Sequence, residues 1–137
     1  ECKHNLNYWR FGDYIAVGAG AHGKYRLTND DIIRYQNASN PTIYMKNLIS
    51  NKSSHQEKLL SNSDKIFEFM LNNLRLMSGF SISHFESATG LKYHAIEKKL
   101  SELKNLKLMK YYPSGYWKPT ALGFKFLDNL QCEFLKV

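Results

Sequence analysis

The sequence predicts an α+β fold that is mainly α-helical, with a winged-helix-like domain in its C-terminal half. From Asp64 onward, apolar residues recur at spacings of three and four, which is typical of amphipathic helices. Two runs rich in aromatic residues, 108–112 and 116–118, flank a Pro-Ser-Gly turn, a pattern typical of a β-hairpin. Earlier in the chain, residues 14–17 are apolar and partly β-branched, which predicts a buried strand.

This predicted strand leads into the sequence GAGAHG, residues 18–23, which we call the glycine bend. Glycine lets the backbone adopt positive φ values or approach a ligand closely. A strand that ends in such a bend is a common way to present backbone groups to a cofactor. The glycine bend is therefore the first candidate site in the chain.

The glycine bend also matches G-x-G-x-x-G, the dinucleotide-binding fingerprint. That fingerprint needs a helix that begins inside the motif and an acidic residue about 20 positions further on. Residues 24–29 show no helical periodicity, and the region around residues 39–42 is neutral. The sequence therefore argues against a dinucleotide site.

Residues 24–62 are predicted to be a connecting region with one short helix, at about residues 41–50. Asn40 is a good N-cap and Pro41 suits the first helical position. His55 is predicted to be a solvated loop residue, because no partners stand at metal-ligand spacing. The apolar side of the helix would be formed by Ile43, Tyr44, Leu48 and Met45.

Residues 63–137 are predicted to form the winged-helix-like domain. Its first helix would be capped by Ser61 or Ser63, carry Asp64 in its first turn and end at Gly79. The predicted apolar side of this helix is Ile66, Phe67, Met70, Leu74 and Met77.

Two further helices and a final one complete this predicted domain. The second helix opens with a capping box at residues 83–86 and stops before Gly90. The third, at about 92–105, buries Ile96, Leu100 and Leu103 and exposes Lys98, Lys99 and Lys104. After the hairpin, Thr120 caps a last helix, whose inner face is Leu122, Phe126, Leu127, Leu130 and Phe134. We expect this domain to fold on its own.

Charge and hydropathy limit the class of partner. The net charge of +7 admits nucleic acid or anionic cofactors. The third helix nevertheless starts with Lys92-Tyr93-His94 and lacks the Arg, Asn or Gln that read bases, so we expect no nucleic-acid binding. No apolar run approaches the roughly 18 residues of a membrane span. Cys2 and Cys132 are isolated, which predicts no metal site made by this chain alone and suits a reducing cytoplasm.

Several motifs together make the chain resemble a known family. HNxxYW at residues 4–9 precedes GDYIAVGAGAHG, and residues 68–76 read E-x-x-x-N-x-L-R-L. Two further motifs are Thr89-Gly90 and the T-x-x-G of residues 120–123. The chain resembles the C-terminal third of the oxygen-independent coproporphyrinogen III oxidase-like radical SAM proteins, and within them the heme-chaperone (HemW-type) branch.

The resemblance implies a longer parent protein. In it, a partial (β/α) barrel holds a [4Fe-4S] cluster on a CxxxCxxC loop together with S-adenosylmethionine. Residues 1–23 would be the last barrel strand and the glycine bend. The residues on the S-adenosylmethionine side of that bend would be Gly18, Gly20, Ala21 and His22. Since this chain has no CxxxCxxC loop, it should not be catalytic by itself. Without neighbouring barrel strands, its first 23 residues should be irregular, paired with a second copy, or packed on the C-terminal domain.

His4 is a candidate axial ligand for heme iron, and Tyr8 and Trp9 could supply flat apolar surface against the porphyrin. The alternative is that His4 and Asn5 hydrogen-bond a turn while the two aromatic residues fill a core.

The leading functional hypothesis is the C-terminal part of a cytoplasmic heme chaperone, which binds heme and delivers it to an acceptor protein. The alternative is a true oxygen-independent coproporphyrinogen III oxidase, which performs an oxidative decarboxylation. A winged-helix nucleic-acid binder is the third reading. The apolar strand predicted at residues 14–17 could pair with a second copy if it is exposed, so a homodimer is a further hypothesis.

Overall fold

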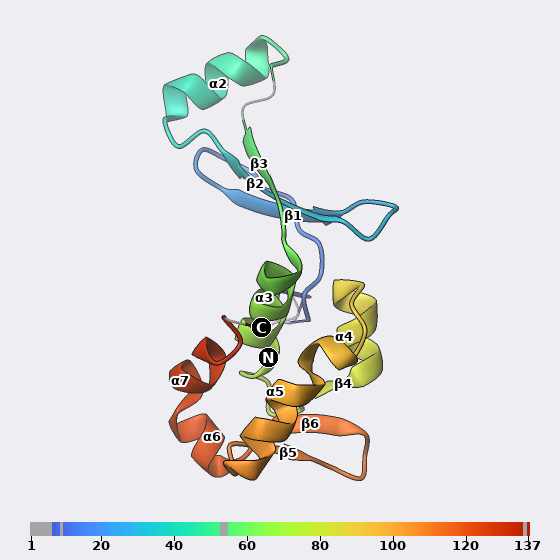
Figure 1. Cartoon of the computed structure of the whole chain (residues 1–137). Helices are drawn as coiled ribbons and strands as arrows, with labels where there is room; N and C mark the ends of the chain where they lie inside the picture. Colours follow the sequence, from blue (N-terminus) through green and yellow to red (C-terminus); the bar gives the residue numbers. More distant parts are fainter. Residues whose placement is uncertain (1–6, 9, 53–54, 136) are drawn as a thin grey trace. The chain divides into compact units, whose positions relative to one another are not determined.

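The computed structural model describes residues 7, 8, 10–52, 55–135 and 137, and the chain divides into two compact units. We call Asp13–Leu60 the sheet unit, and Glu1–Gly12 with Ser61–Val137 the helical unit. Within the described residues, six helices and two three-stranded sheets form a mixed α/β fold (Figure 1). The predicted combination of helices with short strands is confirmed.

The sheet unit is a small antiparallel sheet with one helix. Its strands are β1 (His22–Arg26), β2 (Ile32–Asn37) and β3 (His55–Leu59), and β2 lies in the middle. The helix α2 (Pro41–Ile49) connects β2 to the segment before β3 (Figure 1). The Asn40 side chain accepts hydrogen bonds from the backbone N–H groups of Thr42 and Ile43, which confirms the predicted cap.

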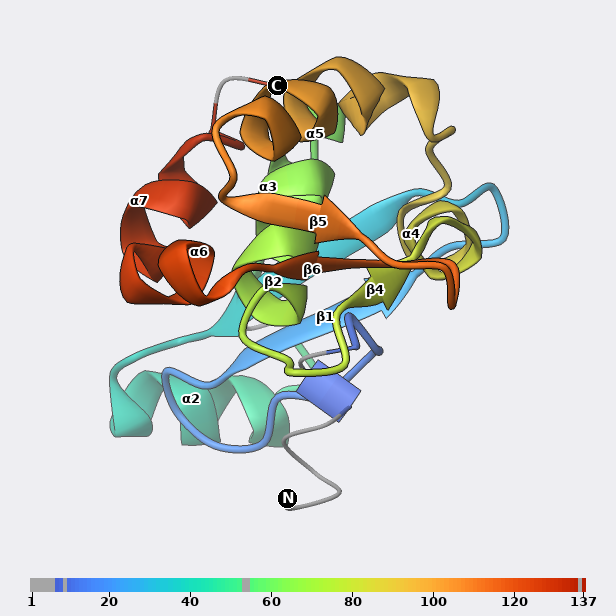
Figure 2. The same ribbon diagram turned by 90° about the horizontal axis from the view of Figure 1, so that it is seen from below.

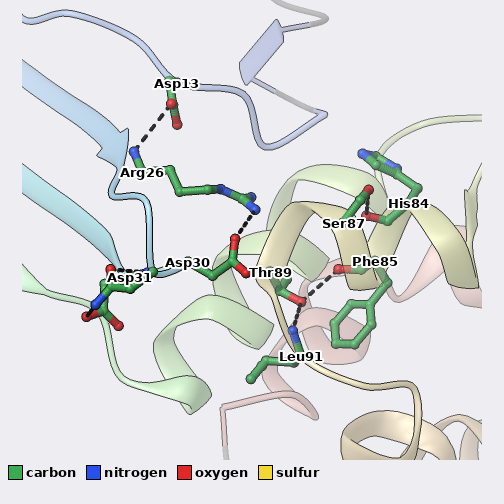
Figure 3. Close-up of polar contacts among 10 residues, drawn as sticks. Asp13, Arg26, Asp30, Asp31, His84, Phe85, Ser87, Thr89 and Leu91 are labelled. Atoms are coloured by element: carbon green, nitrogen blue, oxygen red, sulfur yellow. Dashed lines mark hydrogen bonds and ion pairs between the residues drawn. The ribbon is translucent and has the colours of Figure 1, made fainter.

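The turn between β1 and β2 is fixed by acidic side chains (Figure 3). Asp30 adopts a φ of 65°, and its carboxylate pairs with the Arg26 guanidinium at 3.2 Å. The Asp13 carboxylate accepts a hydrogen bond from the Arg26 backbone N–H at 3.3 Å. The Asn29 amide donates to Asp31 at 2.7 Å, and the Leu27 N–H donates to the Asp31 carbonyl at 2.8 Å. Side chains and backbone thus close the turn without a glycine.

The prediction of one short helix in residues 24–62 is right about the helix but misses all three strands. On β2, Ile33, Tyr35 and Asn37 point to one face, and Ile32, Arg34 and Gln36 to the other. Both faces thus mix polar and apolar residues, which hides the alternation. His55 opens β3, so its prediction as a loop residue is wrong.

The prediction of a buried strand at residues 14–17 is also wrong. Tyr14 makes a single bridge with Lys24, and the next three residues belong to no strand. Ile15 and Val17 are 82% and 83% exposed. The backbone of this stretch bonds instead to side chains of the sheet unit, as described below.

The helical unit begins with α3 (Asn62–Asn73), β4 (Phe80–Ser81), α4 (Ile82–Thr89) and α5 (His94–Asn105). It continues with the hairpin β5 (Met109–Tyr111) and β6 (Tyr116–Pro119), and ends in α6 (Ala121–Lys125) and α7 (Leu127–Cys132). The hairpin is confirmed, and β6 lies between β4 and β5 (Figure 2).

Aromatic rings form the centre of the core of this unit. Phe69 is fully buried, and its ring meets those of Phe80 and Phe85 edge-on at centroid distances of 5.3 and 5.2 Å. Such edge-to-face pairs add stabilisation beyond the area that they bury. The largest fully buried aliphatic side chains of this unit are Met70, Leu74, Ile96, Leu100, Leu103, Met109 and Leu130.

The first helix of this unit is shorter than predicted. Ser61 caps α3 and forms a capping box with Asp64, as expected. The helix ends at Asn73 rather than at Gly79, because residues 74–79 form successive tight turns. Met77 is consequently exposed, whereas Phe69, which the apolar pattern omitted, is buried.

The cap of α4 is Ser81 and not Ser83, because the Ser81 hydroxyl accepts the His84 backbone N–H at 3.1 Å. The predicted stop is confirmed, with Gly90 at a φ of 72°. Near this end, Thr89 donates to the Phe85 carbonyl at 2.7 Å and accepts from the Leu91 N–H at 3.2 Å (Figure 3).

The third and last helices also differ in detail. Ile96, Leu100 and Leu103 are buried as predicted, but Lys99 is only partly exposed and pairs with Glu133 at 3.1 Å. The single last helix is in fact two, because Phe126 breaks it with a φ of −115° and a ψ of 39°. Leu130 and Phe134 are buried as predicted, whereas Leu122 and Phe126 are exposed.

Across the described part of the chain, no helix combines the length and apolarity that crossing a membrane requires.

Candidate functional site: the glycine bend and the tyrosine pocket

The first two glycines of the glycine bend adopt the positive φ values that glycine favours. Gly18 has a φ of 101° and Gly20 a φ of 70°. A side-chain carbon built onto Gly18 would have no atom within 4 Å, so the backbone there borders open space. A ligand could therefore approach the Gly18 backbone closely.

Gly23, the third glycine, has a different role. It lies within β1, directly opposite Tyr35 of β2. A side-chain carbon at this position would overlap the tyrosine ring, so Gly23 makes room for that ring to lie over the strand. Because β1 follows where a dinucleotide fingerprint needs a helix, the motif has no helix N-terminus to hold a pyrophosphate.

Three side chains hold the backbone of residues 16–18. The Ala16 N–H donates to the Tyr35 hydroxyl at 2.9 Å, and the Gly18 N–H donates to the Tyr44 hydroxyl at 3.2 Å. The Asn37 amide nitrogen donates to the Ala16 and Gly18 carbonyls, at 3.3 and 2.9 Å. We call Tyr35, Asn37 and Tyr44 the bend clamp.

Backbone hydrogen bonds attach the rest of the bend to the end of β2. The Gly20 N–H donates to the Ala38 carbonyl at 2.9 Å. The Asn37 N–H donates to the Ala21 carbonyl, also at 2.9 Å. The Gln36 amide nitrogen also donates to the Gly20 carbonyl at 3.5 Å, so side chains and main chain of β2 together hold the bend.

A cavity of about 570 Å³, which we call the tyrosine pocket, adjoins the bend. Its size lies in the range of small-molecule sites. Every residue that lines it belongs to the sheet unit, and the bend clamp forms part of its wall. The lining residues are Ala16, Tyr25, Tyr35, Asn37, Tyr44, Asn47, Leu48, Asn51, Lys52, His55 and Glu57.

One carboxylate organises the β3 side of the tyrosine pocket. The Glu57 carboxylate contacts His55 Nε2 at 2.8 Å and accepts a hydrogen bond from the Tyr25 hydroxyl at 3.1 Å. The hydrogen bond with His55, followed by that with Tyr25, lowers the pKa of Glu57 below its ordinary value. Desolvation, followed by the hydrogen bond to Glu57, raises the pKa of Tyr25.

The predicted site residues do not all lie in one unit. The sheet unit contains four of them within five positions, namely Gly18, Gly20, Ala21 and His22. His22 is exposed at the start of β1. Tyr8 belongs to the helical unit and is half-buried, and its carbonyl accepts the Phe11 N–H at 3.0 Å. His4 and Trp9 lie outside the described residues.

The bend clamp and most of the tyrosine pocket are not among the residues predicted from the sequence. The available signal was the alternation of Ile33, Tyr35 and Asn37, which places a hydroxyl and an amide on one strand face. Gly23 opposite a large aromatic ring is a second signal, but it can be read only once the register of β1 and β2 is known.

In the described parts of the chain, no three His, Cys, Asp or Glu side chains gather as a metal site would require. Cys132 is free and exposed, and Cys2 lies outside the described residues. A [4Fe-4S] cluster is commonly bound by four Cys thiolates, whereas this chain has two cysteines.

Comparisons with known proteins agree on one family. Residues 60–124 match the family described as HemN C-terminal domain. The heme chaperone HemW of Haemophilus influenzae is 35% identical over 98% of this chain, and that of Escherichia coli K12 is 35% identical over 98%. The HemW of Buchnera aphidicola from Acyrthosiphon pisum is 37% identical over 99%.

A solved structure, coproporphyrinogen III oxidase (HemN) from Escherichia coli, described as a radical SAM enzyme, matches with a TM-score of 0.56. The two chains share 20% identity, and the aligned region covers 90% of this chain and 28% of the oxidase. At this level of identity, the likeness concerns the fold alone.

The chain is therefore similar to the HemN-type family, whose C-terminal domain matches its residues 60–124. Within that family, the relatives that match nearly the whole chain are heme chaperones named HemW. The chain spans 34% or 35% of the length of these relatives, about a third of each.

Proposed function

We propose that this chain is the C-terminal part of a radical SAM heme chaperone that binds heme and transfers it to acceptor proteins. The observation that carries the proposal is the identity of 35–37% with HemW proteins over 98–99% of the chain. The likeness to the oxidase rests on a structure with 20% identity, which does not favour oxidase activity.

In the complete protein, residues 1–23 would form the end of the radical SAM domain. Ile15 and Val17, exposed here, would be covered by neighbouring parts of that domain, because apolar side chains of this size gain about 1.5–3 kcal/mol each on burial. Residues 63–137 would act as a winged-helix-like domain, which is supported by the order α3, α4, α5, β5, β6 and α6.

The glycine bend would face S-adenosylmethionine through Gly18, Gly20, Ala21 and His22. The open space beside Gly18 fits a contact with its backbone, and such a contact does not depend on a side chain. His22 is exposed and could add a polar contact. The [4Fe-4S] cluster would be bound by cysteines of another part of the protein.

Heme would bind near the HNxxYW motif, with His4 as the axial ligand and Tyr8 and Trp9 against the porphyrin face. The alternative role for His4 is a hydrogen bond that holds a turn. We further propose a cytoplasmic location without nucleic-acid binding. We also propose that the chain can form a homodimer, which sedimentation would test.

The experiment uses the complete protein. Heme should bind with a defined Soret band and move to an apo-acceptor protein, whereas coproporphyrinogen III should not be decarboxylated. Turnover of coproporphyrinogen III without heme transfer would contradict the proposal.

The role of His4 has its own test in the complete protein. If His4 ligates iron, His4→Ala should shift the Soret band while the melting temperature stays unchanged. If His4 instead holds a turn, the loss of its hydrogen bond in His4→Ala should lower stability by about 1 kcal/mol without a spectral change. An unchanged Soret band would refute ligation by His4 but not the chaperone function.

A further inference from the structure

The segment that leads into the glycine bend is fully hydrogen-bonded at Ala16 and Gly18 without a partner strand. Residues 15–20 belong to no strand, yet two N–H groups and two carbonyls between Ala16 and Gly18 have partners. Side chains of the bend clamp supply all four partners. These side chains therefore supply the hydrogen-bond partners that a neighbouring strand supplies at the edge of a sheet.

Each member of the bend clamp is itself held in place. The Tyr35 ring lies over Gly23, and its aromatic neighbours are Tyr25 and His55, at centroid distances of 5.8 and 5.0 Å. Asn37 is 7% exposed and is the last residue of β2. Tyr44 comes from α2, which contributes no buried residue, so its hydroxyl is one of the links between that helix and the bend.

The two N–H donors of the Asn37 amide restrain the segment that leads into the bend. They reach carbonyls two residues apart, and these carbonyls flank the exposed Val17. Together with the two tyrosine hydroxyls, they fix the chain on both sides of the point where Gly18 turns to a φ of 101°. Without these bonds, the glycines would leave the bend free to sample many conformations.

We propose that Tyr35, Asn37 and Tyr44 are positioning residues that hold the Ala16–Gly18 backbone in the conformation that receives the cofactor. The cofactor part of this inference rests on the proposed function, in which the glycine bend faces S-adenosylmethionine. Gly23 serves the same end, because only a residue without a side chain lets the Tyr35 ring reach its place. The GxGxxG pattern is thus explained by two glycines that turn and one that makes room.

The first arm of the test measures amide hydrogen exchange in this chain. Tyr35→Phe removes the acceptor for Ala16 and should speed exchange of the Ala16 amide about fivefold or more, as expected for the loss of one hydrogen bond. Tyr44→Phe should do the same for Gly18. The matched control is Tyr25→Phe, which removes a hydroxyl that bonds to Glu57 and not to the bend. Unchanged Ala16 and Gly18 exchange in the clamp variants would overturn the proposal.

The second arm uses the complete protein. Asn37→Asp keeps the shape of the side chain but removes both donors, so S-adenosylmethionine should bind about tenfold more weakly. Cluster absorbance and heme binding should stay as in the wild type, which a general loss of structure would not allow. The melting temperature should fall, because a buried carboxylate then faces two carbonyl oxygens. Equal affinity in Asn37→Asp and wild type would overturn the cofactor part.

The two arms separate this inference from the proposed function. If the wild-type complete protein bound no S-adenosylmethionine, the proposed function and the cofactor part would both fail. The exchange result would still decide whether the clamp sets the conformation of the bend.

Discussion

The two units of this chain are held together by different kinds of interaction. In the helical unit, the rings of Phe69, Phe85 and Phe134 are completely buried. In the sheet unit, α2 has no buried residue, and Lys24 and Asn37 are among the few buried side chains. The helical unit relies on an apolar core, whereas the sheet unit relies on the hydrogen bonds of its three strands and on those between side chains and backbone.

This difference has energetic consequences. Removing a buried phenylalanine costs about 3–5 kcal/mol, whereas one hydrogen bond contributes about 1 kcal/mol net. The sheet unit should therefore open locally at lower free energy than the helical unit. A segment that receives a cofactor benefits from being adjustable, and the bend clamp lies in the less stable unit.

The largest expected effect is in the core of the helical unit. Phe69→Ala should lower the free energy of unfolding by about 3–5 kcal/mol, because the ring packs against Phe80 and Phe85 and leaves a cavity. Urea unfolding followed by circular dichroism measures this. The control Phe126→Ala, at a position 47% exposed, should cost less than about 1 kcal/mol. Similar losses in the two variants would contradict the proposed core.

The next effect is in the sheet unit. Gly23→Ala should cost about 1–3 kcal/mol, because the new methyl group overlaps the Tyr35 ring. Amide exchange of Ala16 should accelerate while that of Leu100 in α5 stays the same. In a Tyr35→Ala background, the same glycine substitution should cost much less, since the two residues act through one contact. Additive costs would refute the role given to Gly23.

A smaller effect compares two serines at the start of α4. Ser81→Ala should cost about 1 kcal/mol, because its hydroxyl caps the helix at the His84 N–H. Ser83→Ala should cost only a few tenths of a kcal/mol, in the range of ordinary surface changes. Equal costs by urea unfolding would favour the capping box predicted from the sequence over the cap in the structure.

The smallest effect is a pH dependence of the sheet unit. The hydrogen bond with His55, and then that with Tyr25, hold the pKa of Glu57 below its ordinary value of 4.5. The stability that this carboxylate contributes is therefore complete above that value and lost as the pH falls below it. Nuclear magnetic resonance of the β3 amides should report the loss on acidification. Glu57→Gln should remove this component, and an identical acid response in both proteins would contradict it.

Several elements of the fold could be predicted because their signals are local. The Asn40-Pro41 start of α2, the Ser61 cap of α3 and the Gly90 stop of α4 each depend on neighbouring residues only. The hairpin of β5 and β6 could be predicted from the Pro-Ser-Gly turn between its strands. Such features follow from local backbone chemistry and need no knowledge of the tertiary structure.

The features that could not be predicted depend on contacts between distant residues. The helix α3 ends at Asn73 and the last helix breaks at Phe126, although the apolar periodicity continues past both points. In the candidate site, the positive φ values of Gly18 and Gly20 were predictable from glycine itself. The bend clamp was not, because Tyr44 lies 26 residues from its Gly18 partner. The apolar run at residues 14–17 favoured a strand that only neighbouring strands could have buried.

The most direct test of this account is native-state amide exchange of the wild-type chain over a series of urea concentrations. Leu74 and Leu100 should exchange only through unfolding of the helical unit, with a strong dependence on urea. Ala16 and Gly18 should exchange through local opening of the bend clamp, at lower free energy and almost independently of urea. Equal protection and equal urea dependence at all four amides would show that the two units do not differ as described.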